Sequence, residues 1–272
     1  FSDDSRTTLG TGLSADRADL GAMANSGTAG YFGGGQESSK VDTVDKFAFS
    51  DDSRTTLGTG LSGSRSKLAG MANSGTAGYF GGGQEASNVS TVDKFDFSDD
   101  SRTTLGTGLS AATRHLAAVA NSGTAGYFGG GYGATTLDTI DKFDFSDDSR
   151  TTLATGLGTA RQILAGMANS GTAGYFGGGY ASPTFLSSVE KLTFSNDTLA
   201  LTTALSTARA WWNTGMANSG TAGYIGGGYE SDWSKVDTVD KFDFSDDSRT
   251  TLGTGLSAGR IEIAGMANSD GL

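Results

Sequence analysis

The chain repeats one segment of about 48 residues along nearly its whole length. The stretch Phe49–Leu57 recurs almost letter for letter, and once in a more divergent form, from Phe1, Phe97, Phe145, Phe194 and Phe244. A fixed period of roughly 40–50 residues is typical of stacked supersecondary units, each of which buries its apolar faces against its neighbours. The period therefore predicts one closed array over residues 1–272 rather than a set of unrelated domains.

Each repeat reads as four short β-strands. In the second unit, Phe95 and Phe97 fall on one face of a strand by the two-residue alternation, and Asn73–Gly75 is typical of a tight turn. No stretch has the apolar spacing that an amphipathic helix requires. The strands expected in this unit are 65–73, 76–83, 89–97 and 103–109. Four antiparallel strands in a unit of this length predict a blade of a β-propeller, with an open β-solenoid as the alternative.

The repeat resembles the kelch-repeat propellers. Arg65 stands where the first kelch strand opens, Tyr79–Gly83 places aromatic residues before a glycine pair at the end of the second, and Val92–Asp96 matches the third. The tryptophan expected on the fourth kelch strand is missing, with Thr103–Leu105 in its place, so the chain looks like a divergent branch. The resemblance covers essentially the whole chain and implies an all-β propeller of four-stranded antiparallel blades. The glycines, Gly82 among them, are expected where strands crowd toward the axis.

Five units are complete, and the two ends of the chain hold parts of a sixth. The complete units are residues 17–61, 65–109, 114–157, 161–205 and 209–256. Residues 1–13 match a lone fourth strand, and residues 260–272 match a lone first strand. Because an open strand edge invites association, we expect a six-bladed ring whose shared blade is incomplete in this chain and is finished by residues before Phe1. The alternatives are self-association, in which a second molecule completes the blade, and a five-bladed ring with redundant ends.

Charge and composition exclude several classes of function. A net charge of −11 disfavours nucleic acid as a partner, because phosphate binding needs a basic face. No apolar run approaches the roughly 20 residues of a spanning helix, so we expect no membrane insertion. Cysteine is absent and His115 is the only histidine, so a copper site of the galactose-oxidase type cannot be built. We expect no catalysis, no cofactor and no metal; a glycan-active hydrolase stays open as an alternative, because a carboxylate pair needs neither residue type.

All copies of the repeated turn except the one after Phe194 carry an aspartate pair, such as Asp51 and Asp52. Two carboxylates are too few to hold calcium alone, so we expect the pair to cap its turn. The Asp45–Lys46 dipeptide and its repeats are expected to form exposed or edge ion pairs of small energetic value.

The variation between units is concentrated on one face of the predicted ring. That face carries the loops between second and third strands and the connections between blades, whereas the turns on the opposite face repeat in nearly every unit. Loops on a rigid scaffold commonly carry recognition, with neutral drift as the alternative. Exposed aromatic side chains stack on sugar rings or anchor protein partners. The candidate aromatic residues are Tyr132, Tyr180, Trp211, Trp212, Tyr229 and Trp233, with Phe185 beside them. For Trp211 and Trp212, packing between blades is an equal alternative.

One arginine in each unit is expected to join a ring near the mouth of the central channel. The six are Arg17, Arg65, Arg114, Arg161, Arg209 and Arg260. The kelch resemblance implies an anion-friendly channel, with Arg161 and Arg209 as the candidate binding residues. The favoured alternative is that each arginine bonds carbonyls or a carboxylate of the adjacent blade.

These observations favour a non-catalytic recognition or structural propeller. The acidic, cysteine-free and nearly identical repeats look similar to those of bacteriophage tail-fibre, virion and bacterial surface proteins. The resemblance implies an extracellular or virion-surface location and adhesion to a glycan or protein receptor through the variable face. An intracellular kelch-type adaptor for protein interactions is the alternative.

Overall fold

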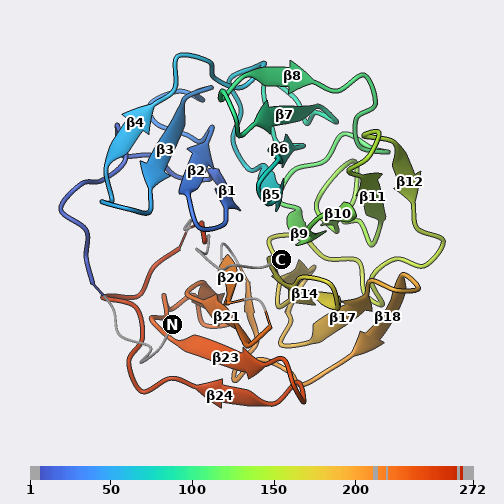
Figure 1. Cartoon of the computed structure of the whole chain (residues 1–272). Helices are drawn as coiled ribbons and strands as arrows, with labels where there is room; N and C mark the ends of the chain where they lie inside the picture. Colours follow the sequence, from blue (N-terminus) through green and yellow to red (C-terminus); the bar gives the residue numbers. More distant parts are fainter. Residues whose placement is uncertain (1–6, 211–213, 219, 262–263, 266–272) are drawn as a thin grey trace.

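The protein is an all-β propeller. The computed structural model describes residues 7–210, 214–218, 220–261 and 264–265, and these ranges contain five four-stranded antiparallel sheets set around a central axis (Figure 1). No helix occurs in them. The predicted blade architecture and the five complete units are thereby confirmed.

The first strand of every blade lies nearest the axis and pairs with the second. The first strands are β1 (Gly21–Asn25), β5 (Ala69–Asn73), β9 (Ala117–Asn121), β13 (Ala165–Asn169) and β20 (Thr214–Asn218). The second strands are β2 (Ala29–Gly33), β6 (Ala77–Gly81), β10 (Ala125–Gly129), β14 (Ala173–Gly177) and β21 (Ala222–Gly226).

The third and fourth strands complete each sheet toward the outside of the ring. The third strands are β3 (Val44–Ala48), β7 (Val92–Asp96), β11 (Ile140–Asp144), β17 (Val189–Thr193) and β23 (Val239–Asp243). The fourth strands are β4 (Arg54–Thr56), β8 (Arg102–Thr104), β12 (Arg150–Thr152), β18 (Thr198–Leu201) and β24 (Arg249–Thr251). Four short extra strands lie in the loops: β15 (Tyr180–Ala181), β16 (Thr184–Phe185), β19 (Arg209–Ala210) and β22 (Tyr229–Glu230).

The observed strands are shorter than the predicted ones, and the fourth differs most. β8 ends at Thr104, although alternation predicted a strand reaching Leu109. The amides of Leu105 and Leu109 still bond to the carbonyls of Val92 and Ser90, so this segment follows the third strand without continuing the ladder. The intervening Gly106 and Gly108 weaken a regular strand because they have no side chain to pack.

In the second, third and fourth blades, the second strand is apolar on both faces because a neighbouring blade covers each face. Every residue of β6 is buried. The Phe80 ring lies against the first blade, where a Cβ built on Gly33 would come within 2.7 Å of it. Phe128 meets Gly81 of the preceding blade in the same way. In the first four blades, the last glycine of the second strand therefore leaves the space into which the next blade inserts a large side chain.

Polar contacts join successive blades near the outside of the same interface. The Tyr79 hydroxyl donates to Asp148 of the next blade at 2.8 Å, and the Lys94 ammonium binds the same carboxylate at 2.7 Å. Burial, followed by the hydrogen bond to Asp148, raises the pKa of Tyr79. Asp147 caps its turn by accepting from the Ser149 amide at 2.9 Å. The predicted capping is thus confirmed for the first aspartate of the pair, whereas the second binds across the interface.

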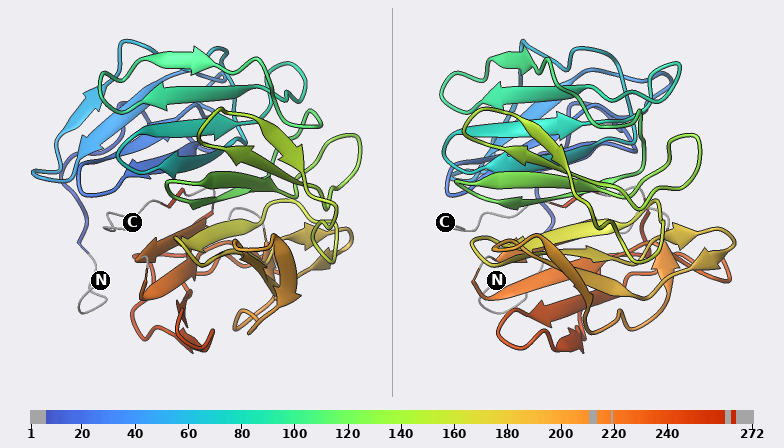
Figure 2. Two further views of the ribbon diagram at one scale, coloured as in Figure 1. Left: turned by 45° about the vertical axis from the view of Figure 1, so that its right-hand side comes forward. Right: turned by 90° about the vertical axis from the view of Figure 1, so that its right-hand side faces the viewer.

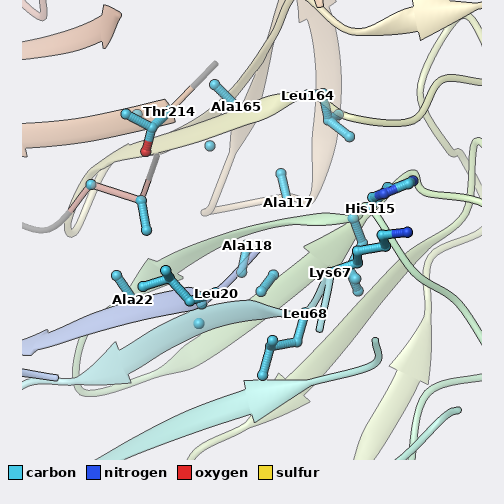
Figure 3. A pocket seen from close by; sticks show the side chains of 18 of the residues that line it. Leu20, Ala22, Lys67, Leu68, His115, Ala117, Ala118, Leu164, Ala165 and Thr214 are labelled. Carbon is cyan, nitrogen blue, oxygen red and sulfur yellow. The ribbon is translucent and has the colours of Figure 1, made fainter. Parts of the chain in front are cut away.

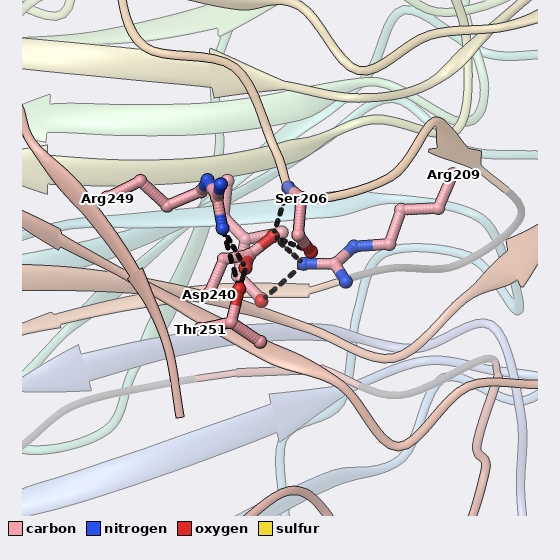
Figure 4. Close-up of polar contacts among 6 residues, drawn as sticks. Ser206, Arg209, Asp240, Arg249 and Thr251 are labelled. Atoms are coloured by element: carbon pink, nitrogen blue, oxygen red, sulfur yellow. Dashed lines mark hydrogen bonds and ion pairs between the residues drawn. The ribbon is translucent and has the colours of Figure 1, made fainter. Parts of the chain in front are cut away.

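A buried carboxylate on the third strand, an aspartate in four blades and Glu190 in the fourth, joins each blade to the segment that enters it. Asp240 accepts hydrogen bonds from the Ser206 amide and hydroxyl and from the Thr251 hydroxyl, and it pairs with Arg209 at 2.8 Å (Figure 4). Burial alone would raise the pKa of Asp240, but these hydrogen bonds and the Arg209 charge outweigh it and hold the pKa below its usual range. Asp45 is likewise buried and paired with Arg17, so the prediction of an exposed pair at Asp45–Lys46 is wrong for the aspartate.

The first and fifth blades flank an interval without a sheet among the described residues. Inner strands contact one another in the order β1, β5, β9, β13 and β20, and no contact of that extent joins β20 to β1. The dark-blue and red segments leading to the two termini both enter this interval (Figures 1 and 2). Within it, the Gly228 amide donates to the Arg260 carbonyl at 2.9 Å. The six-bladed ring stays a prediction.

Candidate functional site

The loops between second and third strands and the connections between blades lie together on one face of the ring. Isolated bridges join connection to loop in successive blades, such as Ser66 to Gln84 and Arg114 to Tyr132, and in the fifth blade β19 pairs with β22. On the opposite face, the repeated turns hold one another, as where the Ser74 amide donates to the Ser122 hydroxyl at 2.8 Å. The loop face is therefore the one on which the units differ.

An aromatic cluster spans the loops of the fourth and fifth blades. Tyr180 and Phe185 face each other across the β15–β16 hairpin with ring centroids 5.6 Å apart. Phe185 meets Trp233 of the fifth blade edge to face at 5.5 Å, and Trp233 meets Tyr229 at 5.8 Å. We call these four residues the aromatic cluster.

The turn that carries Trp233 is held by short-range hydrogen bonds. Asp232 accepts from the Ser234 amide at 2.9 Å and from its hydroxyl at 2.6 Å, and these bonds lower the pKa of Asp232. The Trp233 amide donates to the Glu230 carbonyl at 2.9 Å. Trp233 has a left-handed φ of 64° and a side chain 56% exposed to solvent. A large aromatic ring is thus displayed on the surface in a conformation that bulky residues rarely adopt.

The predicted aromatic residues separate into two groups. Tyr180, Tyr229 and Trp233 come together in the aromatic cluster, and Phe185 links them. Tyr132 lies apart on the third blade, where the Arg114 guanidinium stacks 5.1 Å above its ring. Trp211 and Trp212 lie outside the described residues.

The predicted ring of arginines at the channel mouth is wrong. Arg65, Arg161 and Arg209 are at most 1% exposed, and each binds a carboxylate of the blade that it enters. This is the alternative that the sequence favoured, and it gives Arg161 and Arg209 a structural role. In the third blade, Thr113 takes the buried place, and Arg114 lies one residue further on, outside that network.

A central cavity of about 130 Å³ opens at the loop face and is lined by the first strands (Figure 3). Its walls are mainly glycine, alanine and leucine, and the charged side chains among its described lining residues are Asp19 and Lys67. None of the described residues that line it is an arginine, so they supply no guanidinium charge for the anion-friendly channel that the resemblance implies. A second cavity of about 170 Å³ opens at the opposite end.

The rim of the central cavity is a chain of backbone hydrogen bonds. The Lys67 amide donates to the Asp19 carbonyl at 2.7 Å, the His115 amide to the Lys67 carbonyl at 2.9 Å, and the Ile163 amide to the His115 carbonyl at 2.8 Å. All four residues have left-handed φ values between 57° and 63°. Side chains of four different types occupy these equivalent backbone positions. In the sequence, the rim is visible only as variation between units at this position.

His115 places a titratable imidazole on the rim, beside the side chain of Gln162. Burial, opposed by a hydrogen bond to the Gln162 amide oxygen at 3.3 Å and assisted by the Lys67 and Arg114 charges, lowers the pKa of His115 to about 4. The imidazole is therefore neutral at physiological pH.

Within the part of the chain that the structure describes, no group of three or more histidine, aspartate and glutamate side chains is placed to hold a metal ion. No helix long and apolar enough to cross a membrane occurs in the same residues.

Comparison with known proteins assigns no relative to this chain: no protein-family model matches it, and no curated protein matches it significantly. A proposal of function therefore rests on the fold and on the residues of the loop face.

Proposed function

We propose that the protein is a non-catalytic recognition propeller that binds a glycan through the aromatic cluster. The observation that carries this proposal is the meeting of Tyr180, Phe185, Tyr229 and Trp233 on the loop face, with Trp233 56% exposed. These side chains are absent from the corresponding loops of the first two blades, which have Gln36 and Gln84 in place of the tyrosine.

The chemistry around the cluster suits a sugar. The apolar face of a pyranose ring packs on an aromatic face, and its hydroxyls need hydrogen-bond acceptors nearby. Glu230 and the exposed Asp232 carry such acceptors beside Tyr229 and Trp233. Because Asp232 and Ser234 fix the loop before any ligand arrives, binding costs little ordering entropy.

The wider setting that we propose is adhesion at a cell or virion surface by a kelch-like ring with six blade positions. Its support is the acidic, cysteine-free sequence of nearly identical repeats and the glycine-rich second strands. The described residues at the two ends also keep repeat contacts: Ser14 bonds Asp45 as Ser62 bonds Asp93, and Gly228 bonds Arg260 as Gly131 bonds Arg161.

A glycan array probed with the intact protein tests this proposal. We expect a defined set of glycans to be retained, and Trp233→Ala to lose that binding. Tyr132→Ala is the matched control, because it removes an aromatic ring from the same face but from the third blade, and it should leave binding unchanged. Retention of glycans by Trp233→Ala, or binding of a protein receptor without any glycan, would contradict the proposal.

A further inference from the structure

Side chains of the fifth and first blades that face the interval between them do not make, with other described residues, the contacts that join every other pair of neighbouring blades. In the interfaces between complete blades, a methionine or valine of one first strand packs against the glycine of the next second strand. Met23, Met71, Val119 and Met167 are 3–4% exposed in this way, whereas Met216 of the fifth blade is 37% exposed.

At the end of the fifth blade's second strand, no described residue of another blade fills the space beside Gly226. A Cβ on Gly81 or Gly129 would strike a phenylalanine of the following blade, and on Gly177 it would strike Ile225. A Cβ on Gly226 would meet only Val239, Thr238 and Leu256 of its own blade. On the other flank, Phe32 of the first blade is partly exposed, although its counterpart Phe80 is 0% exposed.

Among the described residues, Asp52 and Arg260 do not make the charged contacts that their equivalents make. Asp100, Asp148, Asp197 and Asp247 each bind a tyrosine and a lysine of the preceding blade. Asp52 is exposed, and its side chain contacts no such pair among the described residues. Arg260 is exposed and bonds Ser257 at 2.9 Å, whereas its equivalents Arg65 and Arg209 are buried against an aspartate.

Together, these missing contacts indicate which residues would fill the interval between the fifth and first blades. The missing glycine, tyrosine and phenylalanine all belong to the repeat's second strand, and the missing aspartate and lysine belong to its third. We infer that the interval between the fifth and first blades binds a β-hairpin with this sequence pattern, Gly-Tyr-Phe-Gly followed by Val-Asp-Lys-Phe. The hairpin's aspartate pairs with Arg260, its lysine and tyrosine bind Asp52, and its phenylalanine enters the space at Gly226.

This hairpin is not one of the second-strand and third-strand pairs in the five complete blades. The second and third strands of those blades are each paired on both edges, so a second intact copy has none to lend. This inference rests on the six-position ring proposed above and is independent of glycan binding, so either can fail alone.

The test uses a fluorescein-labelled peptide with the sequence of residues 76–97, titrated against the folded protein by fluorescence anisotropy. We expect saturable binding that a scrambled peptide of the same composition does not show. Arg260→Gln in the protein, or Asp93→Asn in the peptide, should each weaken binding about 10-fold, as expected for a charge pair at an interface. The two changes together should weaken it no further than either alone.

Arg114→Gln removes the same charge from the third blade and should leave binding unchanged. Failure of the peptide to bind, or equal binding to the wild type and Arg260→Gln, would overturn the inference. So would sedimentation of the protein alone as a dimer that Arg260→Gln dissociates, because a second copy would then fill the interval.

Discussion

The interfaces between complete blades and the aromatic cluster are built from opposite kinds of residue. The interfaces reuse nearly the same side chains from unit to unit, bury most of them, and pair each buried charge. The aromatic cluster uses residues found in only two blades and leaves its largest ring exposed. A chain of nearly identical repeats can thus keep its stability in the repeated positions and vary its loops without loss of the fold.

The third blade sharpens the comparison, because it departs from the repeat inside an interface. Thr113 stands where Arg65 stands in the second blade, yet Asp141 keeps its hydrogen bonds to Ser110 and Thr152. The pair Asp93 and Asp141 therefore separates the contribution of a buried arginine from that of the surrounding hydrogen bonds.

We expect the largest loss of stability from Asp93→Ala. This change leaves the buried Arg65 without its carboxylate, at a cost of about 3–5 kcal/mol in the free energy of unfolding. Asp141→Ala strands no buried arginine and should cost about 1–3 kcal/mol. Urea denaturation of the two variants measures the difference. Equal losses would show that the buried ion pair adds nothing to the interface.

A smaller loss is expected from Gly82→Val. Gly82 has a φ of 65°, and a Cβ there would lie 2.5 Å from the Thr113 carbonyl oxygen. Overpacking and the left-handed backbone together should cost about 2–4 kcal/mol by denaturation. Gly106→Val is the control, since nothing lies within 4 Å of its Cβ and its cost should be small. An unchanged midpoint for Gly82→Val would refute the close approach between blades.

The rim of the central cavity should make the stability of the protein depend on pH through His115. Because the pKa of His115 falls from 6.5 to about 4 on folding, the unfolded chain takes up a proton first as the pH drops. Stability should therefore decline from pH 6.5 to 4, by about 1–2 kcal/mol for this half-buried ring. His115→Gln should remove this part of the decline in pH-dependent melting curves. A wild-type curve that is flat over this range would contradict the burial of the imidazole.

The interfaces were only partly predictable from sequence. Apolar segments bounded by turn residues placed the first and second strands of each blade within a few residues, and alternation did the same for the third. The pairing of Arg65 with Asp93 depends on the return of the chain across a whole blade, which no local pattern contains. Arg114 was misassigned because residue type was followed; counting three residues back from the repeated Leu116 places Thr113 in the buried position.

The sequence predicted which residues belong to the candidate site, but not which of their side chains contact one another. The crowding of aromatic residues in the later units pointed to Tyr180, Tyr229 and Trp233. Which of them meet depends on the geometry between the fourth and fifth blades, and Tyr132 is excluded by that geometry alone. The left-handed rim had no conformational signature, because residues such as Lys67 and Ile163 rarely adopt it.

We expect the smallest effect on stability from the Tyr229→Ala/Trp233→Ala double variant. Its thermal unfolding is the most direct test of the division between scaffold and site. If the aromatic cluster is a recognition surface, the variant's midpoint should stay within about 3 °C of the wild type, since the exposed Trp233 and the partly exposed Tyr229 would contribute little to folding. A fall of more than about 10 °C would show that the cluster holds the fourth and fifth blades together, and would contradict the account.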